Sequence, residues 1–438
     1  MRQKSMNANL SGYVAQVVGD GLCTGCGTCV GICPSGALRM DRSNANGCYS
    51  VHLDSSRCTG CGLCLRACPG HSVDFKALSL EIFGKAATDI RLGNYQGCYL
   101  GHSSDYAVRY NAASGGVITA LLLFALEKGL IDGALVTRMR KDRPLEPESF
   151  IARTREEIID ASKSKYCPVP ANIALKEILA SKEGAKFAVV GLPCHIQGIR
   201  KAESCNKNLK EKIVLHLGLF CSHTDTFFAT EFLLSSLGLN SQDVATINYR
   251  GEGWPGSLSI LLKNGQKKIL PYSKMISAHI LWFFAFPRCT LCCDLTAELA
   301  DISCGDAWLP QLMANDNIGQ SIAICRTRLG SSIFTEAIKT GYINSKQVDP
   351  LIIKQSINMA RTKKKDIRVQ FFLRRLLAKP FPAYRTLLLN PNFTSYLRTA
   401  LLCFNLAISS NKYFRGRLFS YLLHKELSLL GLDKEAGE

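Results

Sequence analysis

A run of four closely spaced cysteines occurs twice near the start of the chain and constrains its fold more than any other feature. The pattern C-x2-C-x2-C-x3-C-P is formed first by Cys23, Cys26, Cys29, Cys33 and Pro34, and again by Cys58, Cys61, Cys64, Cys68 and Pro69. Such spacing is typical of four-iron, four-sulfur clusters, and in two-cluster proteins the fourth cysteine of each run binds the other cluster. We therefore expect one cluster on Cys23, Cys26, Cys29 and Cys68, and a second on Cys58, Cys61, Cys64 and Cys33.

The second cysteine run follows the first by 35 residues. This internal repeat predicts a pseudo-symmetric ferredoxin-like module over roughly residues 13–76. A pair of zinc sites is the alternative, but zinc sites favour two CxxC pairs around a longer gap over three cysteines in close succession. The motif therefore predicts two 4Fe-4S clusters, which carry one electron at a time.

Composition sets the broad class of the protein. With 438 residues, of which 47% are hydrophobic and 20% charged, the chain is expected to fold into two or three globular domains. Residues 1–22 contain no stretch like a signal peptide, and the cysteines cluster at metal-ligand spacings, so we expect a cytoplasmic, reducing location. The longest apolar runs, 115–126 and 275–286, are shorter than the ~20 residues that span a bilayer, so no transmembrane helix is expected.

The positive charge is concentrated at the C-terminal end. Residues 351–438 hold 16 Lys and Arg against 5 Asp and Glu, which is +11 of the net +18. The run Arg361-Thr-Lys-Lys-Lys365 is followed by 371–377, where aromatic, aliphatic and arginine residues interleave. One interpretation is an amphipathic surface for an acidic partner or for peripheral contact with anionic lipid. The other is a solvated helical face packed on the body. We expect no nucleic-acid binding, because no binding motif accompanies the charge.

A small-residue loop opens the part of the chain that follows the ferredoxin module. Ser114-Gly115-Gly116 leads into an apolar helical stretch over 117–128, a turn and a strand over 134–138. Glycines at a helix start leave backbone N–H groups exposed and let a phosphate approach closely. The loop is therefore a candidate cradle for a diphosphate, although serine is also an ordinary helix cap.

The middle of the chain has the pattern of a β-α-β unit. A β-rich run at 186–192, a helical stretch at 194–203 and an apolar run at 212–220 predict two parallel strands joined by a helix. Cys194 and Cys221 then fall just beyond the carboxyl ends of these strands, where open parallel sheets collect ligands. We therefore expect the two thiols to converge on one edge of the sheet.

Two further cysteines, Cys289 and Cys292, form a CxxC pair. A lone CxxC can be redox-active, zinc-binding or structural, but together with Cys194 and Cys221 the pair makes four ligands. The other cysteines outside the motifs have no ligand-like spacing and are interpreted as small apolar residues: Cys48, Cys98, Cys167, Cys205, Cys325 and Cys403.

Several motifs in a fixed order carry a resemblance to a known family. Between residues 95 and 345 these are Ala113-Ser-Gly-Gly-x-x-Thr119, Ser164-Lys-Tyr166, Gly191-Leu-Pro-Cys-His195, Gly218-Leu-Phe-Cys221, Tyr249-Arg-Gly-Glu-Gly-Trp-Pro-Gly256, Cys289-x-x-Cys-x-Asp294 and Ala300-Asp-Ile-Ser-x-Gly-Asp306. In this set the chain resembles the coenzyme F420 hydrogenase/dehydrogenase beta-subunit family, including its members with a fused ferredoxin module.

The resemblance implies an FAD-containing iron-sulfur oxidoreductase that exchanges hydride with the deazaflavin coenzyme F420. It places near the flavin Ser114, Gly115, Gly116 and Thr119, with Lys165 and Tyr166 as further contacts. It assigns a third 4Fe-4S cluster to Cys194, Cys221, Cys289 and Cys292, and it leaves His195 and Lys165 as candidate catalytic residues. The chemistry agrees, because a deazaflavin donates two electrons together whereas a cluster accepts one, so a flavin must stand between them.

The chain departs from the family pattern at several positions. Cys293 is an alternative ligand to its neighbour Cys292, and Cys304 occupies a place where the family commonly has another residue. His195 stands where glutamine is frequent, and a helix-start histidine bonded to backbone is its other interpretation. The segment 317–321 lacks the Trp or Val often found before its serine, which leaves room for a different electron acceptor.

We predict an α+β chain of four parts. These are a ferredoxin-like domain (1–85), the N-terminal region of an α/β flavin domain (86–185), its C-terminal region with the flavin and third cluster around a parallel β-α-β core (186–350), and a basic, mostly helical tail (351–438).

The leading functional hypothesis is an oxidoreductase that couples coenzyme F420, through FAD, to its clusters and to ferredoxin or a partner protein. One alternative is an FAD iron-sulfur reductase of another organic substrate, for example in a polysaccharide pathway. The other is an electron-transfer subunit that docks through its basic tail onto a catalytic partner. Sequence leaves open the direction of electron flow, the acceptor and the oligomeric state.

Overall fold

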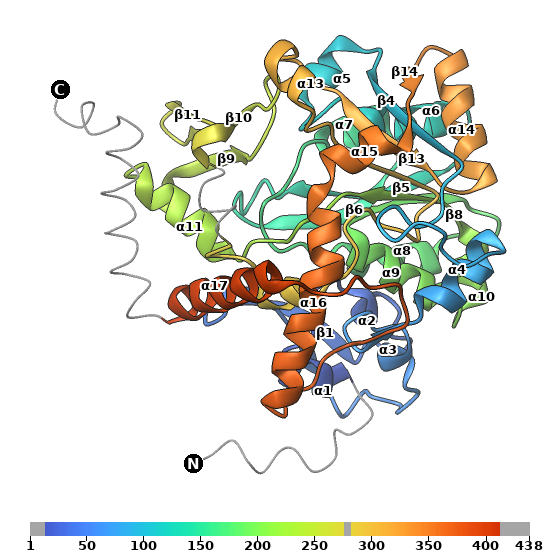
Figure 1. Cartoon of the computed structure of the whole chain (residues 1–438). Helices are drawn as coiled ribbons and strands as arrows, with labels where there is room; N and C mark the ends of the chain where they lie inside the picture. Colours follow the sequence, from blue (N-terminus) through green and yellow to red (C-terminus); the bar gives the residue numbers. More distant parts are fainter. Residues whose placement is uncertain (1–13, 276–281, 412–438) are drawn as a thin grey trace.

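The structure of the protein is a computed structural model that describes residues 14–275 and 282–411 (Figure 1). Residues 276–281 of the apolar run at 275–286 lie outside the described residues, as does the end of the basic tail. No helix in the described ranges is long and apolar enough to cross a membrane.

The N-terminal module is built from short elements around the two cysteine runs, and in Figure 1 it lies at the base of the molecule. A hairpin of β1 and β2 separates the runs, with Leu38 opposite Leu53 in its register. Each run leads into a single helical turn whose preceding glycine, Gly27 or Gly62, has a positive φ. The elements are α1 (Val14–Gly19), α2 (Thr28–Gly31), β1 (Leu38–Ser43), β2 (Cys48–Leu53), α3 (Leu63–Arg66), β3 (Ser72–Val73) and α4 (Phe75–Phe83).

The body of the molecule is organised by one eight-stranded mixed sheet in the order β14-β4-β13-β12-β8-β7-β5-β6. The four strands β12, β8, β7 and β5 are parallel, and antiparallel strands extend both edges. The strands are β4 (Gly97–Ser103), β5 (Gly133–Met139), β6 (Pro147–Ala152), β7 (Phe187–Gly191), β8 (Ile213–Leu219), β12 (Ile302–Asp306), β13 (Ser321–Cys325) and β14 (Ile343–Gln347). The regions 86–185 and 186–350 therefore interleave in a single sheet.

Helices cover both faces of this sheet (Figure 1). Successive strand residues point to opposite faces, so Leu135 and Val189 join the core under α8 and α9, whereas Ala134 and Ala188 join the core under α6 and α14. The helices between the first and last strands are α5 (Tyr106–Asn111), α6 (Val117–Glu127), α7 (Arg155–Asp160), η1 (Ala171–Ala174), α8 (Leu175–Ala180), α9 (Pro193–Glu203), α10 (Lys207–Lys212), α13 (Pro310–Asn315) and α14 (Arg328–Lys339).

The predicted local elements are confirmed in this body. The helix expected at 117–128 is α6, and the strand expected at 134–138 is β5. The β-α-β unit is β7, α9 and β8, and its two strands pair in parallel, with α10 as an additional helix before β8. The fold is thus a ferredoxin-like module joined to an α/β domain, but the sheet is mixed, because strands from both ends of the domain add antiparallel edges to the parallel core.

A smaller unit stands beside the large sheet. It is a three-stranded antiparallel sheet in the order β11-β10-β9, with the apolar helix α11 packed against it. Its elements are α11 (Phe227–Ser236), η2 (Ser241–Asp243), β9 (Val244–Asn248), β10 (Ser257–Leu262) and β11 (Lys267–Pro271), and the short helix η3 (Pro287–Leu291) leads back to the body. This unit carries the glycine-rich segment 249–256 toward the large sheet.

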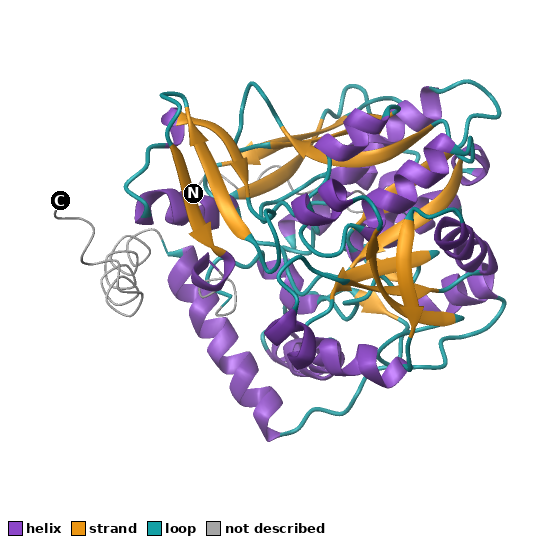
Figure 2. Ribbon diagram, turned by 90° about the horizontal axis from the view of Figure 1, so that it is seen from above, coloured by secondary structure: helices purple, strands orange, loops and turns teal. Residues whose placement is uncertain are grey.

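The C-terminal segment is bound into the molecule as α15 (Pro350–Ser356), α16 (Asn358–Leu376), β15 (Ala383–Tyr384) and α17 (Phe393–Ser410). Strand β15 pairs in parallel with β3 of the ferredoxin module. In both views α17 lies along one margin of the molecule (Figures 1 and 2). The predicted solvated lysine face is wrong in part, because Lys363 and Lys364 are only 7% and 2% exposed. Both lie on the face of α16 that packs on the body.

The ferredoxin module packs closely on α9 and η1. Asn172 donates its backbone N–H to the Cys26 carbonyl (2.9 Å) and its side-chain amide to Thr28 Oγ1 (2.8 Å) and to the His195 carbonyl (2.9 Å). A Cβ added to Gly198 would come within 2.2 Å of Thr28 Oγ1. The missing side chain at Gly198 therefore lets the first cysteine run lie directly against the start of α9.

A buried ionic network fastens β8 to the loop before β12. His216 lies between Glu203 (Nε2 to Oε1, 2.6 Å) and Asp301 (Nδ1 to Oδ2, 3.0 Å). Burial and the nearby Arg200 lower the pKa of His216, but Glu203 and Asp301 outweigh them and the pKa is raised. Charged His216 therefore stabilises the fold.

This network predicts a specific pH dependence. The stabilisation from His216 is fully present below its ordinary pKa of about 6.5 and is lost as pH rises through its raised folded pKa. Urea unfolding of wild type and His216→Gln between pH 6 and 9 should show wild type losing stability relative to the variant as pH rises. Parallel pH profiles of the two proteins would contradict this assignment.

Candidate iron-sulfur and flavin site

Within the ferredoxin module, the fourth cysteine of each run lies with the other run, as predicted. Burial raises the pKa of the Cys29 thiol, and the nearby Cys26, Cys23 and Cys68 raise it further. Burial also raises the pKa of the Cys68 thiol, and Cys26 adds to the effect. These four thiols therefore form one group.

The second group is assembled in the same way around Cys64. Burial raises the pKa of this thiol, and Cys61 and Cys33 add to the effect. Cys61 is exposed and Cys58 half-buried, so this group lies nearer to solvent than the first. The module thus presents one inner and one outer set of thiols.

The structure brings together a third group from three separate parts of the α/β domain. Cys194 begins α9, Cys221 follows β8, and Cys289 and Cys292 lie in and just after η3. Burial raises the pKa of the Cys194 thiol most, followed by the charges of Cys26, Cys221, Cys289 and Cys292. The convergence expected from the parallel strands is confirmed, and Cys26 connects the third group to the inner ferredoxin group.

The neighbouring cysteines have different surroundings. Cys293 is buried beside Lys364 and Glu298, and Cys304 is buried in the core under α6 and α14. Cys292 is among the thiols whose charges raise the pKa values of Cys194 and Cys221, after the larger effect of burial. Among the described residues, no three His, Cys, Asp or Glu side chains are arranged to hold a single metal ion. A four-iron cluster takes its thiolates at the corners of a cage, farther apart than around one ion.

Hydrogen bonds position the third group of thiols. The Thr224 N–H donates to Cys289 Sγ (3.4 Å), and the Cys292 thiol donates to the Asp294 carbonyl (3.3 Å). Arg288 is buried and donates to the Leu22 carbonyl of the ferredoxin module (2.8 Å). The CxxC segment is therefore tied both to the end of β8 and to the first cysteine run.

The Ser114-Gly115-Gly116 loop lies against the segment that precedes β13. Ser114 Oγ donates to the Gln320 carbonyl (3.0 Å), and the Gly115 N–H donates to Ser321 Oγ (2.9 Å). The Gly115 N–H is therefore not among the free N–H groups that the loop was expected to offer. The N–H groups of Gly116, Val117 and Ile118, at the start of α6, have no hydrogen-bond acceptor among the residues that the structure describes, and Gly116 has a φ of +76°.

An ion pair holds the glycine-rich segment 249–256 onto β12. Arg250, 1% exposed, donates through Nη1 and Nη2 to Asp306 (3.1 and 3.0 Å). Trp254 Nε1 donates to the same carboxylate (2.9 Å), and its backbone N–H donates to the Asn317 carbonyl (2.7 Å). The guanidinium lies 4.4 Å from the ring centre of Tyr272. Motifs far apart in the sequence thus meet around the Ser114 loop.

The side-chain nitrogens of the two candidate catalytic residues, His195 and Lys165, all form hydrogen bonds with backbone groups. His195 Nδ1 accepts the Leu192 N–H (3.1 Å) and Nε2 donates to the Val169 carbonyl (3.0 Å). Burial lowers the pKa of His195 to about 4. Lys165 Nζ donates to the carbonyls of Ala161 (2.6 Å) and Ser162 (2.7 Å), and burial lowers its pKa to about 7. The interpretation of His195 as a helix-start residue bonded to backbone is confirmed.

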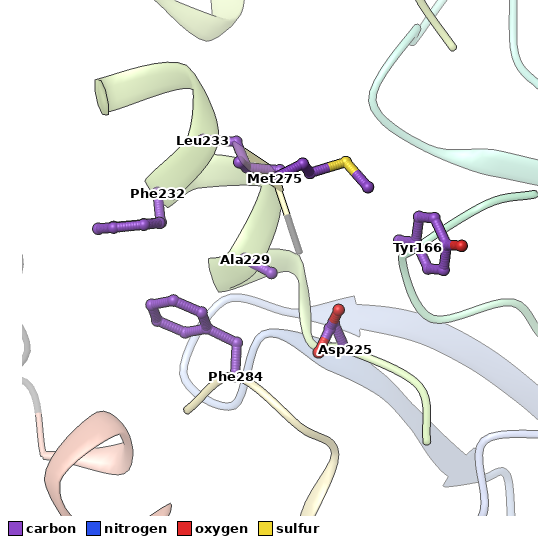
Figure 3. A pocket seen from close by; sticks show the side chains of 7 residues that line it. All are labelled: Tyr166, Asp225, Ala229, Phe232, Leu233, Met275 and Phe284. Carbon is purple, nitrogen blue, oxygen red and sulfur yellow. The ribbon is translucent and has the colours of Figure 1, made fainter. Parts of the chain in front are cut away.

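A small cavity of about 20 Å³ lies between Tyr166 and helix α11 (Figure 3). Tyr166 forms one side, and Ala229, Phe232 and Leu233 of α11 form the other. Asp225 lies at its base, one residue from Thr224, whose N–H bonds Cys289. Tyr166 therefore shares this cavity with Asp225, whose neighbour Thr224 bonds Cys289, and its role as a flavin contact stays a prediction.

A larger cavity of about 250 Å³ lies between the β1–β2 hairpin, α11 and α17. Its wall includes Cys23 of the inner ferredoxin group and the aromatic residues Tyr49, Phe228, Phe283 and Phe286. Sequence reasoning did not anticipate this cavity, because its walls come from segments that are far apart in the chain.

Several residues at the site were not singled out from the sequence. Arg250 and Asp306 lie inside recognised motifs, and a charged residue within a glycine-rich segment was a usable signal. For Lys363 the sequence signal was weaker: Ala360 and Ile367, three residues before it and four after it, indicate that this side of the helix is buried. Asn172 had none, because its role depends on the docking of two domains.

Comparison with known proteins agrees with this arrangement. Family models match at residues 22–71 (4Fe-4S dicluster domain), at 98–176 (the N-terminal part of the coenzyme F420 hydrogenase/dehydrogenase beta subunit) and at 184–350 (the C-terminal part of the same beta subunit). The chain is 29% identical over 276 residues to the coenzyme F420 hydrogenase subunit beta of Methanosarcina barkeri, covering 62% of this chain and 88% of that protein.

Two further relatives extend the comparison. The coenzyme F420-dependent sulfite reductase of Methanocaldococcus jannaschii is 28% identical over 364 residues, which are 80% of this chain and 51% of that protein. A chain of the F420-reducing [NiFe] hydrogenase complex from Methanosarcina barkeri matches with a TM-score of 0.52 and 25% identity, covering 66% of this chain and 95% of that chain.

Fold and site together define an iron-sulfur electron-transfer protein in which a ferredoxin-like module is fused to an α/β domain. The chain belongs to the coenzyme F420 hydrogenase/dehydrogenase beta-subunit family.

Proposed function

We propose that this protein is an FAD-dependent oxidoreductase that transfers electrons between coenzyme F420 and three 4Fe-4S clusters. The observation that carries the proposal is the surroundings of the Cys194 thiol, which include Cys221, Cys289 and Cys292 of the third group together with Cys26 of the inner ferredoxin group. Such a sequence of thiol groups provides a path for single electrons from a buried site to the outer group, where Cys61 is exposed.

The ligand assignment follows the three thiol groups. The inner ferredoxin cluster is assigned to Cys23, Cys26, Cys29 and Cys68, the outer one to Cys58, Cys61, Cys64 and Cys33, and the third to Cys194, Cys221, Cys289 and Cys292. We assign Cys292 in place of Cys293 because its charge raises the pKa values of the Cys194 and Cys221 thiols, which indicates that it lies close to them. Cys293 lies beside Lys364 and Glu298.

The residues around the Ser114 loop fit a bound flavin nucleotide. First-turn N–H groups of α6 that find no acceptor among the described residues provide donors for a diphosphate, and Gly116 has no side chain to block it. When bound, FAD would exchange two electrons as hydride and release them singly. Tyr166 would lie beside it, near the third thiol group. We assign His195 and Lys165 to positioning, because their nitrogens already bond to backbone groups.

The tightness of the glycine loop can be tested by adding one methyl group. In Gly115→Ala the new Cβ would lie 2.6 Å from the Gly101 carbonyl oxygen and 2.7 Å from the Ser321 nitrogen, so the loop must shift. We expect a lower melting temperature and a severalfold lower ratio of FAD to protein. Gly19→Ala is the matched control, because nothing lies within 4 Å of its added Cβ. Equal FAD retention in both variants would contradict this placement of the flavin.

The activity is tested with the anaerobically purified protein. Reduced or oxidised coenzyme F420 is added, and its absorbance is followed with a one-electron acceptor or donor present. We expect the deazaflavin absorbance to change at a rate proportional to enzyme concentration. FAD-loaded protein that leaves this absorbance unchanged would exclude coenzyme F420 as substrate.

A second candidate function is the reduction of a different organic molecule, and the 250 Å³ cavity beside Cys23 favours it. Its aromatic walls suit a planar apolar compound, and Cys23 places it next to the inner ferredoxin group. If this function is correct, Phe228→Ala should alter the turnover of an artificial quinone acceptor while reduction of the flavin stays unchanged.

The role of an electron-transfer subunit is favoured by the exposed face of α17. Phe393 is 74% exposed and Phe404 62% exposed, while the polar Ser395 and Thr399 are buried against the body. Since relatives are named as subunits of hydrogenases, a partner subunit is a suitable occupant of this apolar face. The double variant Leu397→Glu, Leu401→Glu should then abolish co-purification with the partner without changing cofactor content.

A further inference from the structure

A buried lysine from the C-terminal helix reaches into the third thiol group. Lys363 lies in the middle of α16 and is 7% exposed. Its Nζ donates to the Asp294 carbonyl (2.9 Å) and to the Cys221 carbonyl (3.1 Å). Both carbonyls belong to the chain segments that carry the third thiol group, so the ammonium is held against this group.

The charge of Lys363 has no ordinary partner. Its neighbour Lys364 forms a buried ion pair with Glu298 (2.7 Å), but no carboxylate among the described residues forms an ion pair with Lys363. Burial lowers the pKa of the Lys363 ammonium, but the negative charges of Cys292, Cys221, Cys289 and Asp294 outweigh burial and the pKa is raised. A buried charge is costly unless it is compensated. The thiols, and whatever anionic group they bind, are the natural compensation.

A similar lysine stands beside the inner ferredoxin group. Lys201 of α9 donates through Nζ to the carbonyls of Cys68 (2.7 Å) and Ser72, and Cys68 and Cys26 are among its negative neighbours. Lys363 and Lys201 thus each bond to backbone carbonyls beside a different thiol group. Substitution of one lysine is therefore a control for substitution of the other.

We propose that Lys363 is the fixed counter-charge of the third cluster and holds that cluster at a higher reduction potential than its ligands alone would. The inference rests on the proposed function, because it requires a cluster on Cys194, Cys221, Cys289 and Cys292. Reduction adds one electron, and thus one negative charge, to a four-cysteine cluster. A nearby cation in a site shielded from water favours the reduced state.

The position of Lys363 also gives the C-terminal segment a role. The matched beta-subunit family model ends at residue 350, whereas Lys363 lies thirteen residues beyond it. The basic run at 361–365, which suggested a surface for an acidic partner, thus contributes a cation to the interior of the redox site.

The test is an EPR-monitored redox titration of the full-length, anaerobically purified holoprotein. Each cluster gives one reduction step in this titration, and the step that is missing in Cys194→Ala belongs to the third cluster. Lys363→Met should lower the midpoint of this step by at least about 59 mV, a tenfold change in a one-electron equilibrium constant, and leave the other steps in place. Lys363→Arg, which keeps the charge, should shift it less, and Lys201→Met should shift an inner-module step instead.

The outcomes separate this inference from the proposed function. If wild-type protein contains only about eight irons per chain, it has no third cluster and the proposed function is contradicted. With about twelve irons present, an unchanged midpoint in Lys363→Met, or an equal shift in Lys363→Arg, would overturn the role of the charge alone. If Lys363→Met loses the third cluster, retention of its iron and midpoint in Lys363→Arg supports the proposal, whereas loss in both variants overturns it.

Discussion

Replacing Cys194 by alanine is expected to lower the iron content of the anaerobic protein from about twelve to about eight atoms per chain. The reason is that Cys194 belongs to the third thiol group, with Cys221, Cys289 and Cys292 as its neighbours. A four-iron cluster that loses one of its four thiolates is no longer held firmly. Iron and acid-labile sulfide analysis, with EPR of the reduced protein, measures the loss.

Two matched controls sharpen this result. Cys304→Ala removes a buried thiol that lies in the core under α6 and α14, so its iron content should equal that of wild type. Cys293→Ala removes the thiol adjacent to Cys292 and should also retain all the iron. Loss of four irons in Cys293→Ala together with full retention in Cys292→Ala would show that the ligand assignment in this pair must be exchanged.

Breaking the Arg250–Asp306 pair is expected to cause the largest loss of stability among single substitutions that disturb the segment 249–256. In Asp306→Ala the guanidinium of Arg250, 1% exposed, loses a bidentate partner and keeps its charge. Removing one partner of a buried ion pair lowers the free energy of unfolding by about 3–5 kcal/mol. Because the side chain of Asp306 is 22% exposed, we expect a loss at the lower end of this range, about 3 kcal/mol.

Urea unfolding followed by tryptophan fluorescence measures this effect, since Trp254 also loses its bond to Asp306. The control is Asp41→Ala, which breaks the exposed pair with Arg39 (2.9 Å) and should cost at most about 1 kcal/mol. Retained FAD should fall together with stability in Asp306→Ala, because the segment 249–256 is held by this carboxylate. Equal unfolding midpoints for the two variants would refute the assigned role of the pair.

Local sequence patterns were sufficient for the elements that depend on near neighbours. The apolar run of β7, the helix α9 and the apolar run of β8 predicted a parallel unit, and therefore the convergence of Cys194 and Cys221. The antiparallel edges of the sheet were not predictable in this way. Strand β13 pairs with β4, and β14 pairs with the other side of β4, across more than two hundred residues, so no local pattern reports those contacts.

The basic tail shows why charge patterns in isolation mislead. The run 361–365 has the composition of a solvated surface, yet Lys363 bonds to carbonyls inside the molecule and Lys364 pairs with Glu298. A lysine is buried only where other segments bring compensating groups to it. Those groups come from the third thiol region, which lies some seventy residues upstream or more.

The cysteine runs by themselves determined that this chain has a ferredoxin-like 4Fe-4S module, because three thiolates within seven residues leave few other chemical solutions. Sequence also determined the family, because its motifs are recognised by their residues and their order along the chain, without knowledge of which motifs are in contact. Only the tertiary structure decided that Cys26 lies beside Cys194, that His195 and Lys165 bond to backbone, and that Lys363 reaches the third thiol group. The physical reason is that burial and electrostatic compensation depend on which distant segments pack together, and the linear order of residues does not encode that directly.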